Sequence, residues 1–210
     1  MRAVLAALLL CVTLGLVLGT ARAEEKPEAR AKPKSGLLPK SWLEAMPWRP
    51  IGPASMGGRI TSIAVYEAEP TQWWAATASG GLLKTVDNGI TFEHQFDSEA
   101  VVSIGDVAVA QTDPKLLWVG TGECNPRNSV SWGNGVYKSI DGGTTWKHMG
   151  LDQSFQIGAV RIHPKDPNTV YVGALGRLWG PNEERGLFKT TDGGKTWEKL
   201  WYLDDKTGVI

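Results

Sequence analysis

One eight-residue pattern occurs three times in this chain. It reads TVDNGITF at Thr85–Phe92, SIDGGTTW at Ser139–Trp146 and TTDGGKTW at Thr190–Trp197. Each copy has a hydroxyl side chain, an Asp two positions later, then a Gly, a Thr and an aromatic residue. The copies recur roughly every fifty residues, a period that is typical of propellers, solenoids and arrays. The repeat therefore predicts a stack of equivalent units, and by itself it indicates no function.

Each unit contains four segments that are typical of short β-strands, rich in β-branched and aromatic residues. In the third unit these segments span 157–162, 169–173, 186–190 and 196–201. Asp192-Gly193-Gly194 joins the last two, and such a sequence favours a hairpin because glycine adopts positive φ at little cost. The second unit has a corresponding arrangement, with its first turn expected at Asp113-Pro114.

The fold class predicted from these units is all-β. Four strands per repeat with regularly spaced turns indicate four-stranded antiparallel propeller blades, and we expect blades at about 57–97, 101–150 and 155–203. A β-sandwich is the alternative, but it would not repeat the whole four-strand unit. Residues 208–210 match the start of the inner strand at 158–160, so they predict the beginning of a fourth blade.

The predicted propeller is incomplete, because closed propellers have about four to eight blades. We therefore expect residues 46–210 to be the N-terminal part of a propeller whose remainder follows in a longer chain. Assembly of several copies into a ring is the alternative. In this interpretation the open face of the third blade exposes Trp197, Trp201 and unpaired strand edges.

The repeated pattern has a structural explanation. Its Asp accepts hydrogen bonds from the backbone amides of its own turn, and its Thr closes the turn through the hydroxyl group. The aromatic residue is expected to fill space against the neighbouring blade. The residues assigned to this structural role are Asp87, Gly89, Thr91, Phe92, Asp141, Gly143, Thr145, Trp146, Asp192, Gly194, Thr196 and Trp197.

The N-terminus predicts export. Arg2 precedes an apolar run over 3–18 and a small-x-small sequence at 21–23, which together are typical of a secretory signal peptide over 1–23. A retained membrane anchor is the alternative. Residues 24–45 are largely charged and proline-rich, so we interpret them as a flexible linker. The expected location is secreted or periplasmic.

Charge and composition exclude several partners. The chain has 22 basic and 22 acidic residues, so we expect neither nucleic acid nor, after signal cleavage, a membrane as partner. The three histidines have no metal-ligand spacing, and we predict no metal and no cofactor. Only Cys124 remains after cleavage, which excludes an internal disulfide.

The repeated pattern resembles the Asp-box, or bacterial neuraminidase (BNR), repeat. Such repeats occur in sialidases, xyloglucanase-type glycoside hydrolases, sortilin-like receptors and a photosystem assembly factor. Four further segments are similar to large secreted bacterial proteins described as glycosyl hydrolase-like or sortilin N-terminal-domain-like. These segments are Trp48–Ile60, Ala76–Thr85, Asn128–Ser139 and Gly180–Trp197. The resemblance implies a β-propeller, and its members include enzymes as well as binding proteins.

The chain departs from both enzyme patterns of this group. The arginine triad, tyrosine nucleophile and acidic partner of sialidases are not recognisable here. In xyloglucanase-like relatives a catalytic Asp lies two residues before a Gly-Gly in the first blade, whereas this chain has Ala78 before Gly80-Gly81. The best candidate for a catalytic acid is Glu183, but a glycosidase needs two carboxylates and nothing in the spacing pairs one with it.

Two long connections are the candidate functional surface. They span 121–135 and 174–185, on the face opposite the Asp-box turns, and their Arg, Trp and Asn side chains suit stacking and hydrogen bonding to sugars or peptides. The alternative is that the Trp residues pack the loops while Arg and Glu form ion pairs. The ligand-binding candidates are Arg127, Asn128, Trp132, Arg177, Trp179 and Asn182.

The sequence thus leaves two functions open. The first is a secreted, sortilin-like interaction scaffold that binds a peptide or glycan ligand. The second is a glycoside hydrolase acting on a polysaccharide or glycan, with an active site completed by blades beyond residue 210. The absence of a recognisable acid pair favours the first.

Overall fold

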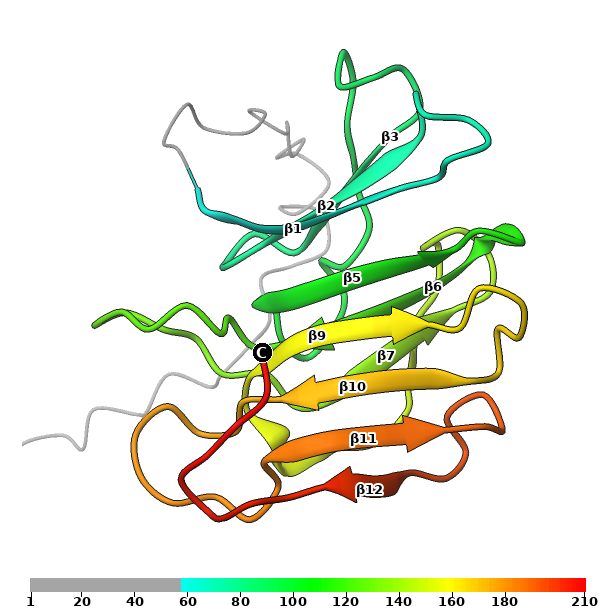
Figure 1. The fold of residues 1–210 in the computed structure, drawn as a ribbon. Helices are drawn as coiled ribbons and strands as arrows, with labels where there is room; N and C mark the ends of the chain where they lie inside the picture. Colours follow the sequence, from blue (N-terminus) through cyan, green and yellow to red (C-terminus); the bar gives the residue numbers. More distant parts are fainter. Residues whose placement is uncertain (1–57) are drawn as a thin grey trace, which may run out of the picture. The chain divides into compact units, whose positions relative to one another are not determined.

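The computed structural model describes residues 58–210, in which three four-stranded antiparallel sheets follow one another along the chain (Figure 1). The first sheet contains β1 (Ile60–Val65), β2 (Trp73–Thr77), β3 (Leu82–Thr85) and β4 (Glu93–His94); the second contains β5 (Ile104–Ala110), β6 (Asp113–Thr121), β7 (Val136–Ser139) and β8 (Lys147–His148); the third contains β9 (Ile157–Ile162), β10 (Val170–Ala174), β11 (Gly186–Thr190) and β12 (Glu198–Trp201). The predicted signal peptide and linker lie outside the described residues.

Within each sheet the strands are hydrogen-bonded in the order of the sequence. This arrangement confirms the predicted all-β fold with four-stranded antiparallel blades. Among the described residues the only helical segment is a single 3-10 turn, η1 (Asp152–Ser154), between the second and third blades. No helix within residues 58–210 has the length and apolarity needed to cross a membrane.

Two local predictions were wrong. The predicted turn at Asp113-Pro114 belongs to β6 instead, because Asp113 pairs with Ala110 and its carboxylate accepts a hydrogen bond from the Lys115 amide. Residues 208–210 form no strand, although they were predicted to begin an inner one. Ile210 lies against Gly158 and Val209 against Gly173, so both contact the inner strands of the third blade.

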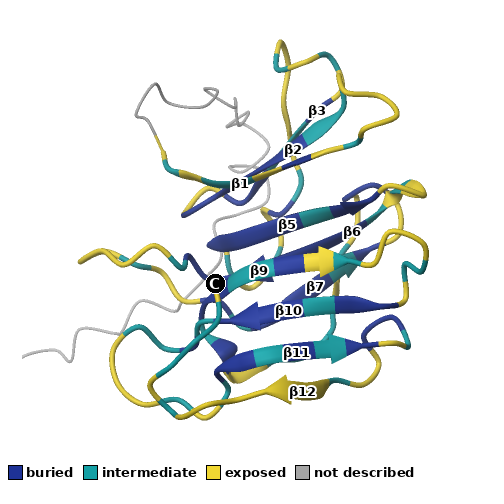
Figure 2. Cartoon of the chain, viewed as in Figure 1, coloured by how far each residue is buried: buried dark blue, intermediate teal, exposed yellow. Residues whose placement is uncertain are grey.

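The hydrophobic core lies between neighbouring blades. One cluster joins Trp74, Leu82 and Phe96 of the first blade to strands β5 and β6 of the second. Another surrounds Trp118 of the second blade and Phe188 of the third. Figure 2 shows the buried residues concentrated in the inner strands and the exposed ones along β12. Each blade is therefore stabilised mainly by the apolar surface that it buries against its neighbours.

The Asp-box turn has the predicted hydrogen bonds. In the second copy, Asp141 Oδ1 accepts hydrogen bonds from the Thr145 amide (2.9 Å) and the Ser139 hydroxyl (2.8 Å), and Oδ2 accepts one from the Thr145 hydroxyl (2.5 Å). Ser139 Oγ in turn accepts a hydrogen bond from the Gly143 amide (2.9 Å). The first and third copies have the same contacts. All of them span four residues or fewer, so each turn closes on itself.

These turns predict a decrease of stability in acid. Hydrogen bonds from the hydroxyl and amide of the following Thr hold the pKa of Asp87 and Asp141 at about 2, below the usual 3.8, and lower that of Asp192 as well. The stabilisation is complete above the unfolded-state pKa and is lost as the pH falls from about 4 through about 2. We expect the urea midpoint to decrease over this interval. Asp141→Asn should make the decrease shallower, and an unchanged profile in this variant would contradict the assignment.

In the second and third copies the Asp-box aromatic residue packs onto the preceding blade, as predicted. Trp146 Nε1 donates a hydrogen bond to the Gln95 carbonyl (2.6 Å), and Trp197 Nε1 donates one to the Met149 carbonyl (2.7 Å). The Trp197 ring also lies edge-on to Trp118, with centroids 5.9 Å apart. The expectation that Trp197 lies on the open face of the third blade was therefore wrong, because its side chain is directed back toward the second blade.

Trp201 does lie on the outer side of the third blade, where it is 46 % exposed next to exposed Leu200 and Leu203. In the first copy the aromatic residue is Phe92, which packs edge-on against Trp73 of its own blade. Phe92 has no N–H to donate. The described chain therefore has two indole hydrogen bonds between blades, one at each of its two blade–blade contacts.

Candidate functional site

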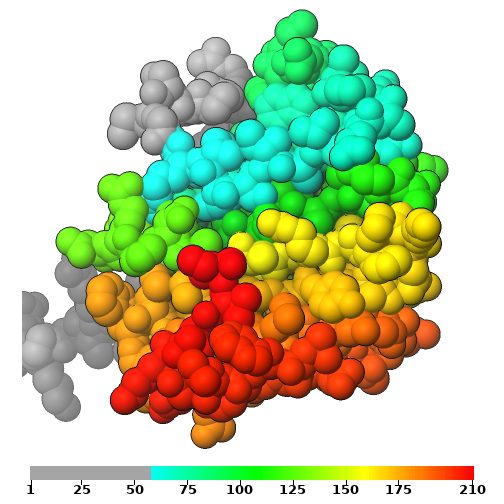
Figure 3. Space-filling model, viewed as in Figure 1, coloured from blue at the N-terminus to red at the C-terminus, as the bar shows by residue number. Residues whose placement is uncertain are grey.

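The two long connections lie at the same end of the blades, with the Asp-box turns at the other (Figure 1). This end carries the β6–β7 loop over 122–135 and the β10–β11 loop over 175–185. Figure 3 shows the β6–β7 loop, in green, projecting from the body of the molecule. The predicted placement of the candidate residues on one face therefore agrees with the topology.

An aromatic–arginine cluster connects the two loops. The guanidinium carbon of Arg177 lies 4.4 Å from the ring centroid of Phe155 and 5.9 Å from that of Trp132. The two rings pack edge to face, with centroids 5.6 Å apart. Trp132 is nevertheless 58 % exposed. The cluster therefore presents an indole surface to solvent, next to a cation held in place by stacking.

Phe155 was missed by the sequence analysis. It follows η1 with φ of 53° and ψ of −56°, a backbone conformation that residues with a side chain seldom adopt. Its carbonyl accepts a hydrogen bond from the Gly133 amide (2.7 Å), which attaches the β6–β7 loop to the third blade. No sequence motif marked this residue, because its contacts come from two other segments.

The β10–β11 loop is held by a buried arginine. Arg185 donates hydrogen bonds to the carbonyls of Leu175, Arg177, Gly180 and Asp205. Because these four acceptors come from both ends of the loop and from the segment after β12, a single side chain fixes the loop backbone. Trp179, next to one of these acceptors, is 68 % exposed.

The other candidates differ in their surroundings. Asn182 Oδ1 accepts a hydrogen bond from the Arg177 amide (3.2 Å), and its Nδ2 donates one to the Gln153 carbonyl (3.2 Å). Its amide group therefore contributes to the loop structure. Arg127 and Asn128 are exposed on the β6–β7 loop. The cluster of Trp132 and Arg177 thus has a defined geometry, and Trp179 is exposed on the neighbouring loop.

The acidic residues of this face have different partners. Glu123 is fully buried and makes a bidentate ion pair with Arg59, across the contact between the first two blades. Glu183 is exposed, and its backbone carbonyl accepts a hydrogen bond from Lys199. Hydrogen bonds from the amides of residues 206 and 207 lower the pKa of Asp204.

Ala78 is buried at the end of β2, and its amide donates a hydrogen bond to the Arg59 carbonyl (3.0 Å). The position at which xyloglucanase-like relatives are expected to have an Asp therefore carries no acid here. Cys124 is partly buried, and desolvation raises the pKa of its thiol, which disfavours the reactive thiolate. Within residues 58–210, no three His, Cys, Asp or Glu side chains converge as a metal site would require.

A polar network also joins the three inner strands. Asp106 of β5 accepts hydrogen bonds from the Ser62 hydroxyl of β1, the Val160 amide (2.7 Å) and the Arg161 guanidinium (2.5 Å). The Asp106 side chain is 6 % exposed and that of Arg161 is 69 % exposed. Sequence reasoning missed this network, because Asp106 occupies a strand position that carries no motif.

Comparisons with known proteins support the same architecture. The BNR/Asp-box repeat family matches residues 188–199. A probable oligoxyloglucan-reducing end-specific xyloglucanase from Neosartorya fischeri is 34 % identical over 99 residues, which cover 45 % of this chain and 10 % of that protein. This chain therefore spans about a tenth of the xyloglucanase.

Two solved structures share the fold. An ancestral GH74 enzyme superposes with a TM-score of 0.54 at 22 % identity, over 70 % of this chain and 19 % of its own length. PorZ, a surface component of the type-IX secretion system of Porphyromonas gingivalis, superposes with a TM-score of 0.50 at 17 % identity, over 69 % of this chain and 20 % of its own. At these identities the similarity establishes the propeller fold alone.

Proposed function

Because this chain is an Asp-box (BNR) repeat protein with the β-propeller fold, we propose that it belongs to a glycoside hydrolase-like propeller and supplies part of its glycan-binding face. The similarity to the fungal xyloglucanase supports a polysaccharide as the ligand class. The observation that carries the proposal is the pair of exposed indoles, Trp132 and Trp179, on the two long loops, with Arg177 stacked beside Trp132.

The chemistry of this face suits a saccharide. An exposed indole offers a flat apolar surface for the C–H face of a sugar ring, and a guanidinium next to it donates hydrogen bonds to hydroxyl groups. The stacking of Arg177 on Phe155 and the fixed backbone from Arg185 limit the motion of these groups. Such preorganisation decreases the entropy lost when a ligand binds.

A second proposal is an interaction scaffold that binds a peptide or glycan without turnover. The partners of the acidic side chains favour this proposal. The Glu123 carboxylate is paired with Arg59, and the Asp204 carboxylate accepts hydrogen bonds from backbone amides. Under both proposals the protein acts outside the cytoplasm, and further blades complete the propeller. Hydrolysis would require two carboxylates, and a partner for Glu183 would have to come from those further blades.

The glycan proposal predicts the outcome of a calorimetric titration. We expect a xyloglucan heptasaccharide to bind the 210-residue chain, and Trp132→Ala and Trp179→Ala each to weaken binding at least tenfold, since each removes a stacking surface. Trp201→Ala is the matched control, because Trp201 is exposed on β12 instead of on the loop face. We expect this variant to bind normally.

Two results would decide against the glycan proposal. One is binding that is equal in all three Trp variants, which would place the saccharide elsewhere. The other is saturable binding of an unrelated peptide at Trp132 with no binding of the heptasaccharide, which would support the scaffold. Release of sugar products that stops in Glu183→Gln would instead assign a catalytic role to Glu183.

A further inference from the structure

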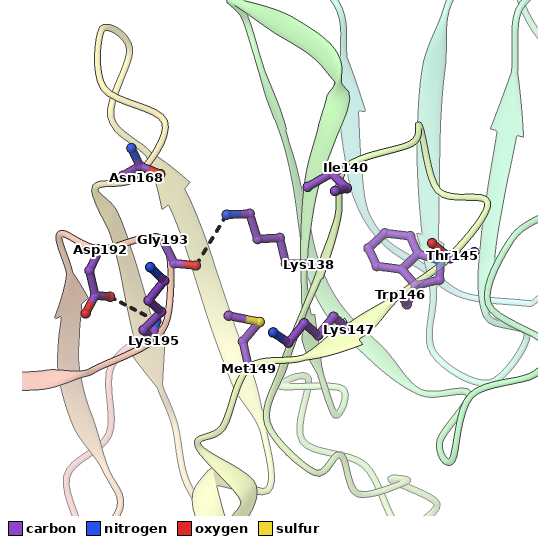
Figure 4. Close-up of a pocket in the computed structure, with 10 residues that line it drawn as sticks. All are labelled: Lys138, Ile140, Thr145, Trp146, Lys147, Met149, Asn168, Asp192, Gly193 and Lys195. Carbon is purple, nitrogen blue, oxygen red and sulfur yellow. Dashed lines mark hydrogen bonds between the residues drawn. The ribbon is translucent and has the colours of Figure 1, made fainter.

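A groove of about 390 Å³ lies between the outer strand of the second blade and the Asp-box turn of the third (Figure 4). This size lies within the range of small-ligand sites. The groove is at the Asp-box end of the blades, away from the two long loops. Three basic and three apolar side chains contribute most to its walls: Lys138, Lys147, Lys195, Ile140, Trp146 and Met149.

The groove carries an excess of positive charge. Lys138 lies over the Trp118 ring and donates to the Gly193 carbonyl (3.3 Å), and burial together with the charges of Lys147 and Lys195 lowers its pKa. The only carboxylate in the lining is that of Asp192. Both of its oxygens already accept hydrogen bonds within their own Asp-box turn. An anion in the groove would therefore meet three ammonium groups and one carboxylate, so the positive charge is in excess.

The second blade contains a buried hydrogen-bond donor that has no partner within the described residues. In the first blade, Trp74 Nε1 donates to Gln95 Oε1 (3.0 Å), and Gln95 Nε2 donates to the Gly142 carbonyl (3.0 Å). In the second blade Trp118 takes the place of Trp74, and Met149 takes the place of Gln95. Trp118 is fully buried, and its Nε1 has no hydrogen-bond partner within the described part of the chain.

Met149 is a flexible part of the groove wall. The terminal methyl of Met149 and the edge of the Trp118 ring both lie against Gly194, and Met149 also lines the groove. A methionine side chain is flexible and adapts to irregular space. A ligand can therefore displace the Met149 side chain and gain space next to the lysines.

We propose that this groove binds the carboxylate of an acidic sugar. The three lysines match a carboxylate, which accepts several hydrogen bonds. The walls formed by Ile140 and Trp146 match the apolar face of a sugar ring. This proposal does not depend on glycan binding at the loop face, which lies at the other end of the blades.

The corresponding groove between the first two blades provides an internal comparison. Its lining includes Glu93 where the second blade has Lys147, and Thr144 where the third has Lys195. In the groove between the first two blades, the hydrogen-bonded amide of Gln95 takes the position that the flexible Met149 side chain has in the next groove. Two equivalent positions of the fold therefore lack the positive charge of the second groove, which assigns the anion site to the Lys147 and Lys195 side chains and not to the repeat itself.

Calorimetric titration of the 210-residue chain with trigalacturonate tests the proposal, with maltotriose as the neutral sugar of equal length. We expect the acidic sugar to bind and the neutral one not to bind. Lys147→Glu and Lys195→Thr, which introduce the residues of the first groove, should each weaken binding at least tenfold. Glu93→Lys is the control, and we expect it to leave the affinity unchanged because Gln95 still fills that groove.

Met149→Gln tests whether binding of the acidic sugar needs the flexible part of the groove wall. It introduces the residue of the first groove, whose amide fills the space that the flexible Met149 side chain can leave, so we expect binding of trigalacturonate to be lost. Equal binding of maltotriose, or full affinity in a folded Met149→Gln variant, would overturn the site. Tighter binding of triglutamate than of trigalacturonate would overturn the assignment to a sugar.

Discussion

Gly105→Ala is expected to lower the free energy of unfolding by about 3 kcal/mol or more, because the inner strands leave no space for a methyl group. A Cβ on Gly105 would lie 1.9 Å from the Ile157 carbonyl oxygen and 2.5 Å from that of Gly122. Both atoms are backbone, so no side chain can rotate away. The second and third blades would have to separate along β5 and β9, which form much of the core.

Urea unfolding followed by tryptophan fluorescence measures this effect. Gly58→Ala is the matched control, because a Cβ at Gly58 would meet no atom within 4 Å. We expect its midpoint to equal that of the unmodified chain. Equal midpoints for the two alanine variants would show that the close approach of β5 and β9 is not needed for stability.

Asp106→Ala is expected to lower the free energy of unfolding by a similar amount, about 3 kcal/mol, because it removes a buried hydrogen-bond acceptor. Asp106 accepts hydrogen bonds from Ser62, Val107, Val160 and Arg161, which belong to all three blades. Its removal leaves the buried Val160 amide without a partner and frees the Arg161 guanidinium.

The matched control is Asp113→Ala, because Asp113 is exposed and accepts a hydrogen bond only from the Lys115 amide. We expect its unfolding free energy to change by less than about 0.5 kcal/mol. Thermal unfolding of both variants is the measurement. If Asp106→Ala lowers the unfolding free energy no more than Asp113→Ala does, the Asp106 network does not stabilise the fold, because water then replaces its hydrogen bonds equally well.

The sequence predicted the elements that depend on near neighbours. The contacts of Asp141 with Ser139 and Thr145 span at most four residues, so the residues that form the turn are also the pattern that reveals it. The period of the pattern then predicted the blades and their four strands. The exception was Asp113-Pro114, where a typical turn sequence begins a strand because Asp113 pairs with Ala110 in β5.

The sequence predicted less of the candidate sites. The two loops were identified by their length and composition, but the stacking of Arg177 on Phe155 was not. The sequence analysis placed Trp197 on the wrong side of its blade. The pattern of a strand shows that successive side chains alternate between two faces, but it does not show which face packs against the neighbouring blade. The unpaired Trp118 N–H required a comparison of equivalent contacts in two blades.

By itself, the sequence determined the repeat, the turn chemistry and the all-β class, because each is set by residues within a few positions of one another. Only the tertiary structure decided which side chains meet across blades, including Glu123 with Arg59 and Asp106 with Val160. These contacts join residues more than fifty positions apart, and they form only when the sheets stack. Their partners are chosen by the packing of one blade on the next, and no local pattern records that choice.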